Sequence, residues 1–300
     1  MNQTAKTILV SGATGMVGQA LCSELIKKGY VVKRLSRSKN TEIQWDLDEK
    51  TIDADAMNDV DAVIHLAGET VAQRWNKAVK TRILNSRVKS AKLLVSAILE
   101  QDNPPTYISA SGINYYGYQC GTGLTEQSPK GDGFLADVCE RWEGAAQPLV
   151  DAGIRTAFIR TGLVLSSQGG ALKRMLPPFK LGLGGRIDSG KQHMSWIGLP
   201  DLARIFCLAV ENTQIQGPVN AVSPKFATNE AFVNTLGELL KRPTALPMPG
   251  AMVKLLFGEM GKETLCSDLG IVPQFLKQIG FEWEYDDLKT CLKACINGEF

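Results

Sequence analysis

The chain has 300 residues, of which 44% are hydrophobic, and its 33 basic residues nearly balance its 31 acidic residues. Such a chain forms one large globular domain, or one domain with a smaller appendage, and it can bury a sizeable core. The net charge of +2 is spread in both signs along the sequence. The sequence therefore lacks the excess of basic residues that is typical of a protein that binds nucleic acid or an anionic membrane surface.

The N-terminus is polar for six residues and leads directly into an apolar strand pattern. We therefore expect no signal peptide, and a cytoplasmic protein. No apolar run approaches the roughly 20 residues that a membrane-spanning helix requires. The seven cysteines are scattered without a Cys-x-x-Cys motif, and only two histidines accompany them. This pattern predicts free thiols in a reducing compartment and no metal site.

The first strand pattern, residues 7–11, is followed by three glycines at three-residue spacing and then by a helix pattern. In a strand–turn–helix unit that binds a dinucleotide, the glycines permit the turn, the approach of the pyrophosphate and close helix packing. The helix N-terminus then offers free N–H groups and a positive dipole to an anion. The alternative is a structural turn that binds nothing. The predicted cofactor contacts at this turn are Gly12, Thr14, Gly15, Met16, Val17 and Gly18.

Strand patterns alternate with helix patterns over the first 160 residues. The strands are predicted at residues 7–11, 31–35, 42–45, 61–68, 107–111 and 155–160, and the helices include 76–100 and 133–151. This alternation predicts an α/β fold with a doubly wound parallel sheet, the NAD(P)-binding Rossmann arrangement. Right-handed crossovers place the loops after the strands along one edge, where ligands bind.

The composition changes after residue 165, where glycine- and proline-rich segments separate shorter patterns. Helices are predicted at residues 199–211, 229–240 and 286–296. We predict a Rossmann domain over residues 1–165, with its sheet completed by later segments up to about residue 225. Residues 166–300 are expected to form a smaller, mostly helical region on the substrate side.

The segment after the second strand predicts which dinucleotide binds. A carboxylate there would hold the ribose 2′-hydroxyl and repel a 2′-phosphate, but the sequence reads Arg34-Leu35-Ser36-Arg37-Ser38. The Arg37 guanidinium matches a phosphate bidentately, and Ser36 or Ser38 can donate a hydrogen bond. We therefore predict NADP as the cofactor. The alternative is a solvated basic turn.

Further cofactor contacts are expected after the third and fourth strands. Asp46 follows the third strand and is placed to accept a hydrogen bond from the adenine amino group. The turn Leu66-Ala67-Gly68 ends the fourth strand and would pass under the adenine ribose with little side-chain obstruction. Both assignments rest on position at the carboxyl end of a parallel strand.

The helix after this turn and the ends of the last two strands complete the predicted cofactor site. Arg82 and Arg87 lie on the helix, where either could reach a phosphate or the ribose. The alternative for both is an ordinary surface salt bridge. Ser109 at the end of the fifth strand is assigned to the same site. Val164 follows the sixth strand in an apolar turn whose backbone could bind the carboxamide.

Several strings resemble the extended short-chain dehydrogenase/reductases. They are the glycine turn, the Leu66-Ala67-Gly68 turn and Ser109-x-Ser111 before Tyr115-Tyr116-Gly117. Arg141-Trp142-Glu143, Arg160-Thr161-Gly162 and residues 178–185 are similar to the YfcH-like branch of atypical members, often labelled epimerase family proteins. The C-terminal third resembles the small domain of that branch. The resemblance implies an NADP-binding Rossmann domain with a substrate-binding C-terminal region, and no known substrate.

Standard members of the superfamily use a Ser together with a Tyr-x-x-x-Lys motif, in which the Tyr moves a proton. Here Phe134 stands where the Tyr is expected and Val138 where the Lys is expected. Phenylalanine cannot exchange a proton and valine cannot hold a charge. Ser111 is retained, and Tyr116 lies just beyond it. Ser111 and Tyr116 are the candidate catalytic residues, with loop packing as the alternative role for Tyr116.

These features predict an NADP-binding protein of the short-chain dehydrogenase/reductase type. As an enzyme it would be an oxidoreductase, or would resemble a nucleotide-sugar epimerase, and its small-molecule substrate is unknown. The alternative is a catalytically silent NADP-binding sensor or regulatory protein; some relatives carry a cell-division-inhibitor label. No nucleic acid or membrane partner is expected, and a homodimer is a possible state.

Overall fold

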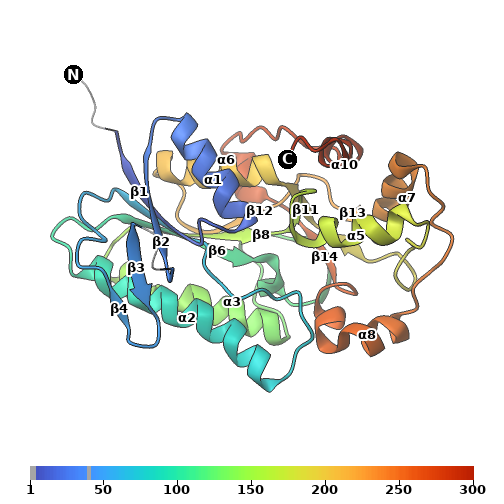
Figure 1. Cartoon of the computed structure of the whole chain (residues 1–300), viewed down its shortest axis with the longest axis horizontal. Helices are drawn as coiled ribbons and strands as arrows, with labels where there is room; N and C mark the ends of the chain where they lie inside the picture. Colours follow the sequence, from blue (N-terminus) through green and yellow to red (C-terminus); the bar gives the residue numbers. More distant parts are fainter. Residues whose placement is uncertain (1–4, 39–41) are drawn as a thin grey trace.

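An eight-stranded sheet forms the centre of the molecule (Figure 1). The structure is a computed structural model that describes residues 5–38 and 42–300. In spatial order the strands are β12 (Gly217–Ala221), β8 (Thr156–Thr161), β6 (Thr106–Gly112), β5 (Ala62–His65), β1 (Thr7–Ser11), β2 (Val31–Ser36), β3 (Ile43–Asp46) and β4 (Thr51–Ile52). The strands pair in parallel, except that β4 is antiparallel to β3. The predicted α/β, doubly wound Rossmann architecture is confirmed.

Helices cover both faces of this sheet, which is why its central strands are apolar on both sides. Ile8 and Val10 of β1 pack toward α1 (Met16–Lys27) and α6 (Leu199–Glu211). Leu9 between them points to the other face, which α2 (Lys77–Leu99) and α4 (Gln147–Asp151) cover. Figure 1 shows α1 and α6 on one side of the sheet and α2 and α3 on the other.

The helix predicted at residues 133–151 is wrong as a single element. It consists of α3 (Phe134–Gly144) and the short α4, separated by two residues outside either helix. Pro148 lies in the first turn of α4. Proline has no N–H, and its ring clashes with the carbonyl four residues earlier, so a helix that reaches it must restart there.

Two smaller sheets lie beyond the large one. One has the order β13 (Ala227–Thr228), β10 (His193–Met194), β14 (Asp268–Ile271) and β7 (Gln119–Leu124), and the other pairs β9 (Leu163–Leu165) with β11 (Trp196–Gly198). Because β14 pairs in parallel with β7, the C-terminal part of the chain returns to the segment that precedes α3. This return brings residues from the last third of the chain against the edge of the large sheet.

The remaining helical segments pack in several places around the sheets. They are the 3-10 turn η1 (Ile113–Tyr116), α5 (Gly170–Lys180), α7 (Asn229–Leu240), α8 (Gly250–Glu263), α9 (Gln274–Gln278) and α10 (Leu288–Asn297). Helices α5, α7 and α10 share a core with β9 and β11. Strand β12 adds a late segment to the large sheet, and the division of the chain near residue 165 stays a prediction. In residues 5–38 and 42–300, no helix combines the length and apolar composition needed to cross a bilayer.

Candidate functional site

The glycine turn between β1 and α1 has the geometry that a dinucleotide requires. Gly12 has a φ of +74°, and a Cβ on it would lie 2.8 Å from the backbone nitrogen of Ala67. A Cβ on Gly18 would overlap the carbonyl oxygen of Gly12. At Gly15 the nearest atom to such a Cβ is that same oxygen, at 3.4 Å. Gly12 and Gly18 are thus required by the fold, whereas the space in front of Gly15 is open to a ligand.

The N-terminus of α1 faces this open space. The N-cap is Gly15, no side chain of the described residues caps the helix, and its first turn contains no acidic residue. The N–H groups of the first turn therefore have no partner within the helix, and the dipole is uncompensated. Thr14 is exposed, and its carbonyl accepts a hydrogen bond from Gln19 Nε2 at 3.0 Å. Met16 packs against Gly169, and Val17 is partly buried in the core.

The carboxyl end of β2 pairs with the start of β3, with Ser36 opposite Gln44, and β3 ends two residues later at Asp46. Ser36 is the last residue of β2, its hydroxyl accepts the N–H of Ser38, and Arg37 is exposed directly after it. Asp46 ends β3 and is exposed as well. Its Oδ1 accepts the N–H groups of residues 48 and 49, which lowers the pKa of Asp46. The side chains of Arg37 and Asp46, which are predicted to contact the cofactor, are thus accessible to a ligand.

The Leu66-Ala67-Gly68 turn rests on Arg87, which sequence reasoning placed among the phosphate contacts. The Arg87 guanidinium donates to the carbonyl oxygens of Glu69 at 2.9 Å and Ile83 at 3.0 Å. A Cβ on Gly68 would lie 3.0 Å from its central carbon. Arg87 therefore holds the turn from beneath, and its contact with a cofactor stays a prediction. Arg82 is exposed on the same helix.

His65, at the end of β5, joins the two turns that flank the open space. Its Nδ1 lies 2.6 Å from the Ser11 hydroxyl, and its Nε2 lies 3.0 Å from the Ser90 hydroxyl. Because Ser90 donates to the carbonyl of Ser86, it accepts from Nε2–H, and Nδ1 then accepts from Ser11. Ser11 in turn accepts the N–H of Ala67 at 3.4 Å. Sequence reasoning missed this link, because a histidine inside an apolar strand gives no local signal.

Burial and the nearby Arg87 charge lower the pKa of His65 to about 3, from an ordinary value of 6.5. The unfolded chain therefore takes up a proton below pH 6.5 that the folded chain refuses until about pH 3. We expect the free energy of unfolding to fall across that window, by up to about 1.4 kcal/mol per pH unit from this group. Urea unfolding at pH 7 and pH 5 measures the loss. Between pH 7 and pH 5, the free energy of unfolding of a His65→Gln variant should fall by about 2 kcal/mol less than that of the wild type. The same pH dependence in both proteins would contradict the lowered pKa of His65.

The register of the sheet aligns Ser111, Arg160 and Asn220 on β6, β8 and β12. Arg160 is buried and forms two bonds with the Glu143 carboxylate, from Nε at 2.9 Å and from its terminal nitrogen at 2.7 Å. The Ser111 hydroxyl donates to the same carboxylate at 2.6 Å. Burial alone would lower the pKa of Arg160, but pairing with Glu143 raises it overall. This edge of the sheet therefore holds a buried ion pair of Arg160 with Glu143.

Tyr116 is part of the same network and is 1% exposed. Its hydroxyl donates to Asn220 Oδ1 at 2.8 Å and accepts from Arg160 at 3.0 Å. Burial raises the pKa of Tyr116, although the Arg160 charge opposes the shift. A phenol in this state is a weak proton donor at neutral pH. The geometry brings Ser111 and Tyr116 together through Arg160, a residue that the sequence placed at a strand end without a role.

Phe134 and Val138, at the positions of the usual acid/base pair, belong to one apolar cluster, and the Lys80 ammonium lies 4.8 Å from the Phe134 ring centroid. The Phe134 ring meets Trp75 edge-on with centroids 5.0 Å apart, and Val138 is buried in the same cluster. Ser109 is buried, and its hydroxyl donates to the carbonyl of Ala110. Val164 is half-buried on β9. In the part of the chain that the structure describes, no cluster of His, Cys, Asp and Glu could hold a metal ion.

Two family profiles match the chain. Residues 8–132 match the NAD dependent epimerase/dehydratase family, and residues 248–295 match a domain of unknown function, DUF1731. An epimerase family protein of Mycobacterium tuberculosis is 36% identical over 95% of this chain and 96% of its own. Human epimerase family protein SDR39U1 is 35% identical over 96% of this chain and 99% of its own.

Solved structures agree with these matches. The crystal structure of human SDR39U1 with NADPH has a TM-score of 0.90 and 34% identity, over 97% of this chain and 99% of that one. A nucleoside-diphosphate sugar epimerase from Corynebacterium glutamicum has a TM-score of 0.80 and 33% identity, over 99% of this chain and 59% of that one. These similarities confirm the resemblance seen in the motifs: the chain belongs to the epimerase family that includes SDR39U1 and carries a DUF1731 domain near its C-terminus.

Proposed function

We propose that this protein binds NADP(H) at the carboxyl edge of the large sheet. The proposal rests on the turn at Gly12–Gly18. Backbone atoms occupy the space that a Cβ would take at Gly12 and Gly18, whereas the space in front of Gly15 is open. The uncapped N-terminus of α1 faces that space and suits a pyrophosphate. The similarity to human SDR39U1, whose crystal structure contains NADPH, supports the same cofactor.

Arg37 is proposed to select NADP(H) over NAD(H). Its exposed guanidinium follows β2 directly and can hold the 2′-phosphate, with Ser36 beside it. We expect Arg37→Ala to weaken NADPH binding by about 10- to 100-fold, because charge-assisted hydrogen bonds are lost, and to leave NADH binding within about threefold. Titration of nucleotide fluorescence measures both affinities. Arg34→Ala, an exposed arginine inside β2, is the control, and equal affinity of the wild type for NADPH and NADH would contradict the proposal.

We further propose an oxidoreductase or epimerase acting on a small molecule. A bound nicotinamide dinucleotide would supply or accept a hydride. Among the chain's own groups, Ser111 is best placed to move a proton, because its hydroxyl already donates to a carboxylate, that of Glu143. Tyr116 would act as a positioning residue, since both of its hydrogen bonds are made inside the protein.

The second candidate function is a silent NADP(H)-binding sensor or regulatory protein. It is favoured by Phe134 and Val138, which leave α3 without the usual Tyr-x-x-x-Lys pair, and by the burial of Tyr116. The two candidates differ in NADPH consumption over a panel of carbonyl compounds. Turnover that Ser111→Ala abolishes favours the enzyme, whereas NADPH binding without turnover of any compound favours the sensor.

A further inference from the structure

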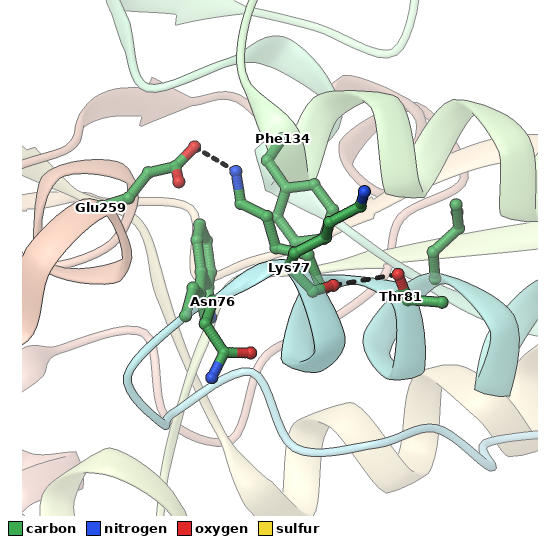
Figure 2. Close-up of a pocket in the computed structure, with 8 residues that line it drawn as sticks. Asn76, Lys77, Thr81, Phe134 and Glu259 are labelled. Carbon is green, nitrogen blue, oxygen red and sulfur yellow. Dashed lines mark hydrogen bonds and ion pairs between the residues drawn. The ribbon is translucent and has the colours of Figure 1, made fainter.

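A cavity of about 400 Å³ opens where α2, α3 and α8 meet (Figure 2). This volume is in the range of small-molecule sites. Its lining residues are Trp75, Asn76, Lys77, Lys80, Thr81, Leu84, Phe134 and Glu259. Phe134 heads the helix on which standard members of the superfamily carry their proton-transferring tyrosine. The cavity thus lies at the N-terminal end of α3, the helix whose other end carries Glu143, the hydrogen-bond partner of Ser111. The DUF1731 domain supplies one wall of the cavity through Glu259.

The walls contributed by α2 and α3 are positive and aromatic. The Lys80 ammonium lies 4.8 Å from the Phe134 ring centroid and 5.9 Å from that of Trp75. Lys77, one turn earlier, is exposed. Both lysines stand in the first turn of α2, which contains no acidic residue, so their charges add to the positive end of the helix dipole. Such a surface favours an anion with a flat apolar body.

One carboxylate neutralises this surface in the structure. Glu259 reaches from α8 and pairs with the Lys80 ammonium at 2.5 Å, while its own side chain stays 44% exposed. Figure 2 shows this contact across the cavity. The Lys80 side chain is 29% exposed, so the pair is partly exposed and contributes modest stability. An incoming anion would therefore lose little in replacing Glu259.

Helix α8 is interrupted beside Glu259 and anchored beyond it. Gly258, the residue before it, has a φ of 62° and a ψ of −141°, which breaks α8 at that point. Four residues further on, Glu263 is buried, and its two carboxylate oxygens accept the N–H groups of Phe134 and Leu135, each at 2.9 Å. The end of α8 is thus anchored to α3, and the break lies beside Glu259.

We propose that the cavity binds the acidic end of the substrate, a phosphate or carboxylate on a flat apolar group, which replaces Glu259 at Lys80. This assignment rests on the proposed function and specifies its substrate class. The anionic group lies between Lys80 and Lys77, and the apolar body lies against Trp75 and Phe134. Glu259 pairs with Lys80 in the free protein and separates from it when the anion binds.

The test uses phenyl phosphate as the probe and isothermal titration of the full chain saturated with NADPH. Lys80→Met should weaken phenyl phosphate binding by about tenfold, because a charge-assisted hydrogen bond is lost. Glu259→Gln should tighten it about threefold, because the competing exposed ion pair is removed. Glu238→Gln breaks another exposed pair, with Lys289, outside the cavity and should have no effect. Benzyl alcohol, which lacks the charge, should not compete.

The outcomes separate this assignment from the proposed function. The affinity for NADPH is measured first. If NADPH does not bind, the proposed cofactor binding is wrong, and the phenyl phosphate titrations are then repeated on the chain without NADPH. If Glu259→Gln leaves phenyl phosphate affinity unchanged, or Lys80→Met binds as the wild type does, the cavity assignment is wrong. Binding that weakens with added salt, together with both variant effects, supports it.

Discussion

Replacing Arg160 by methionine is expected to destabilise the folded protein by about 3–5 kcal/mol, the cost of breaking one side of a buried ion pair. The Arg160 side chain is 4% exposed and that of Glu143 is 11% exposed. The variant leaves the Glu143 carboxylate inside the protein with, among residues 5–38 and 42–300, one remaining hydrogen bond, from Ser111. The substitution also removes the Arg160 N–H that donates a hydrogen bond to the Tyr116 hydroxyl. Urea unfolding at pH 7 measures the loss.

The matched control is the double variant Arg160→Met/Glu143→Gln. Because it removes the uncompensated charge as well, it should regain more than half of the stability lost in the single variant. The surface pair of Lys289 and Glu238, whose side chains are 55% and 64% exposed, gives the comparison, since Lys289→Met should cost about 1 kcal/mol or less. A loss below about 1 kcal/mol in Arg160→Met would contradict the structural role assigned to this pair.

The second large effect is expected at the glycine turn, where two alanine substitutions should separate folding from cofactor binding. Gly18→Ala places a methyl group on the backbone of Gly12 and Ala13, so we expect severe destabilisation. Gly15→Ala meets only one atom, at 3.4 Å, and its φ of −74° suits alanine. Its stability should stay within about 1 kcal/mol of the wild type, as for a changed N-cap.

NADPH affinity should behave differently. In Gly15→Ala the methyl group occupies the open space in front of α1, so we expect NADPH binding to fall by about 100-fold in a folded protein, since the pyrophosphate can no longer approach the backbone. Circular dichroism establishes the fold, and nucleotide fluorescence gives the affinity. A stable Gly15→Ala variant that binds NADPH as the wild type does would show that the turn is only structural.

The sequence predicted those parts of the fold whose patterns are strong and local. Helices α6 and α7 begin and end at the predicted residues, because each has a continuous apolar face. Helix α5 was not predicted, since Pro177 and Pro178 lie inside it. Strand β7 was hidden by Gly121 and Gly123, and its partner β14 lies well over 100 residues away. Pairings of that range leave no periodic signal in one sequence.

The candidate site divides in the same way. The glycine turn follows from spacing, and its steric logic holds at Gly12 and Gly18. The link between His65 and Ser11 spans 54 residues, and that between Ser111 and Glu143 spans 32. Neither pair shares a motif, so only the fold reveals them. Arg87 was predicted to contact the cofactor, which stays a prediction; the hydrogen bonds of its guanidinium to two carbonyl oxygens under the turn were not predicted, because they depend on tertiary packing.

The central claim is that this chain holds NADP(H) in front of Gly15. Titration of the wild-type protein with NADPH and with NADH, in parallel with Gly15→Ala, tests it most directly. We predict saturable binding of one NADPH per chain by the wild type. NADPH should bind at least about tenfold more tightly than NADH, since Arg37 adds a charge-assisted contact. This NADPH binding should be largely lost in Gly15→Ala. No NADPH binding by the wild type, or equal binding by Gly15→Ala, would contradict the claim.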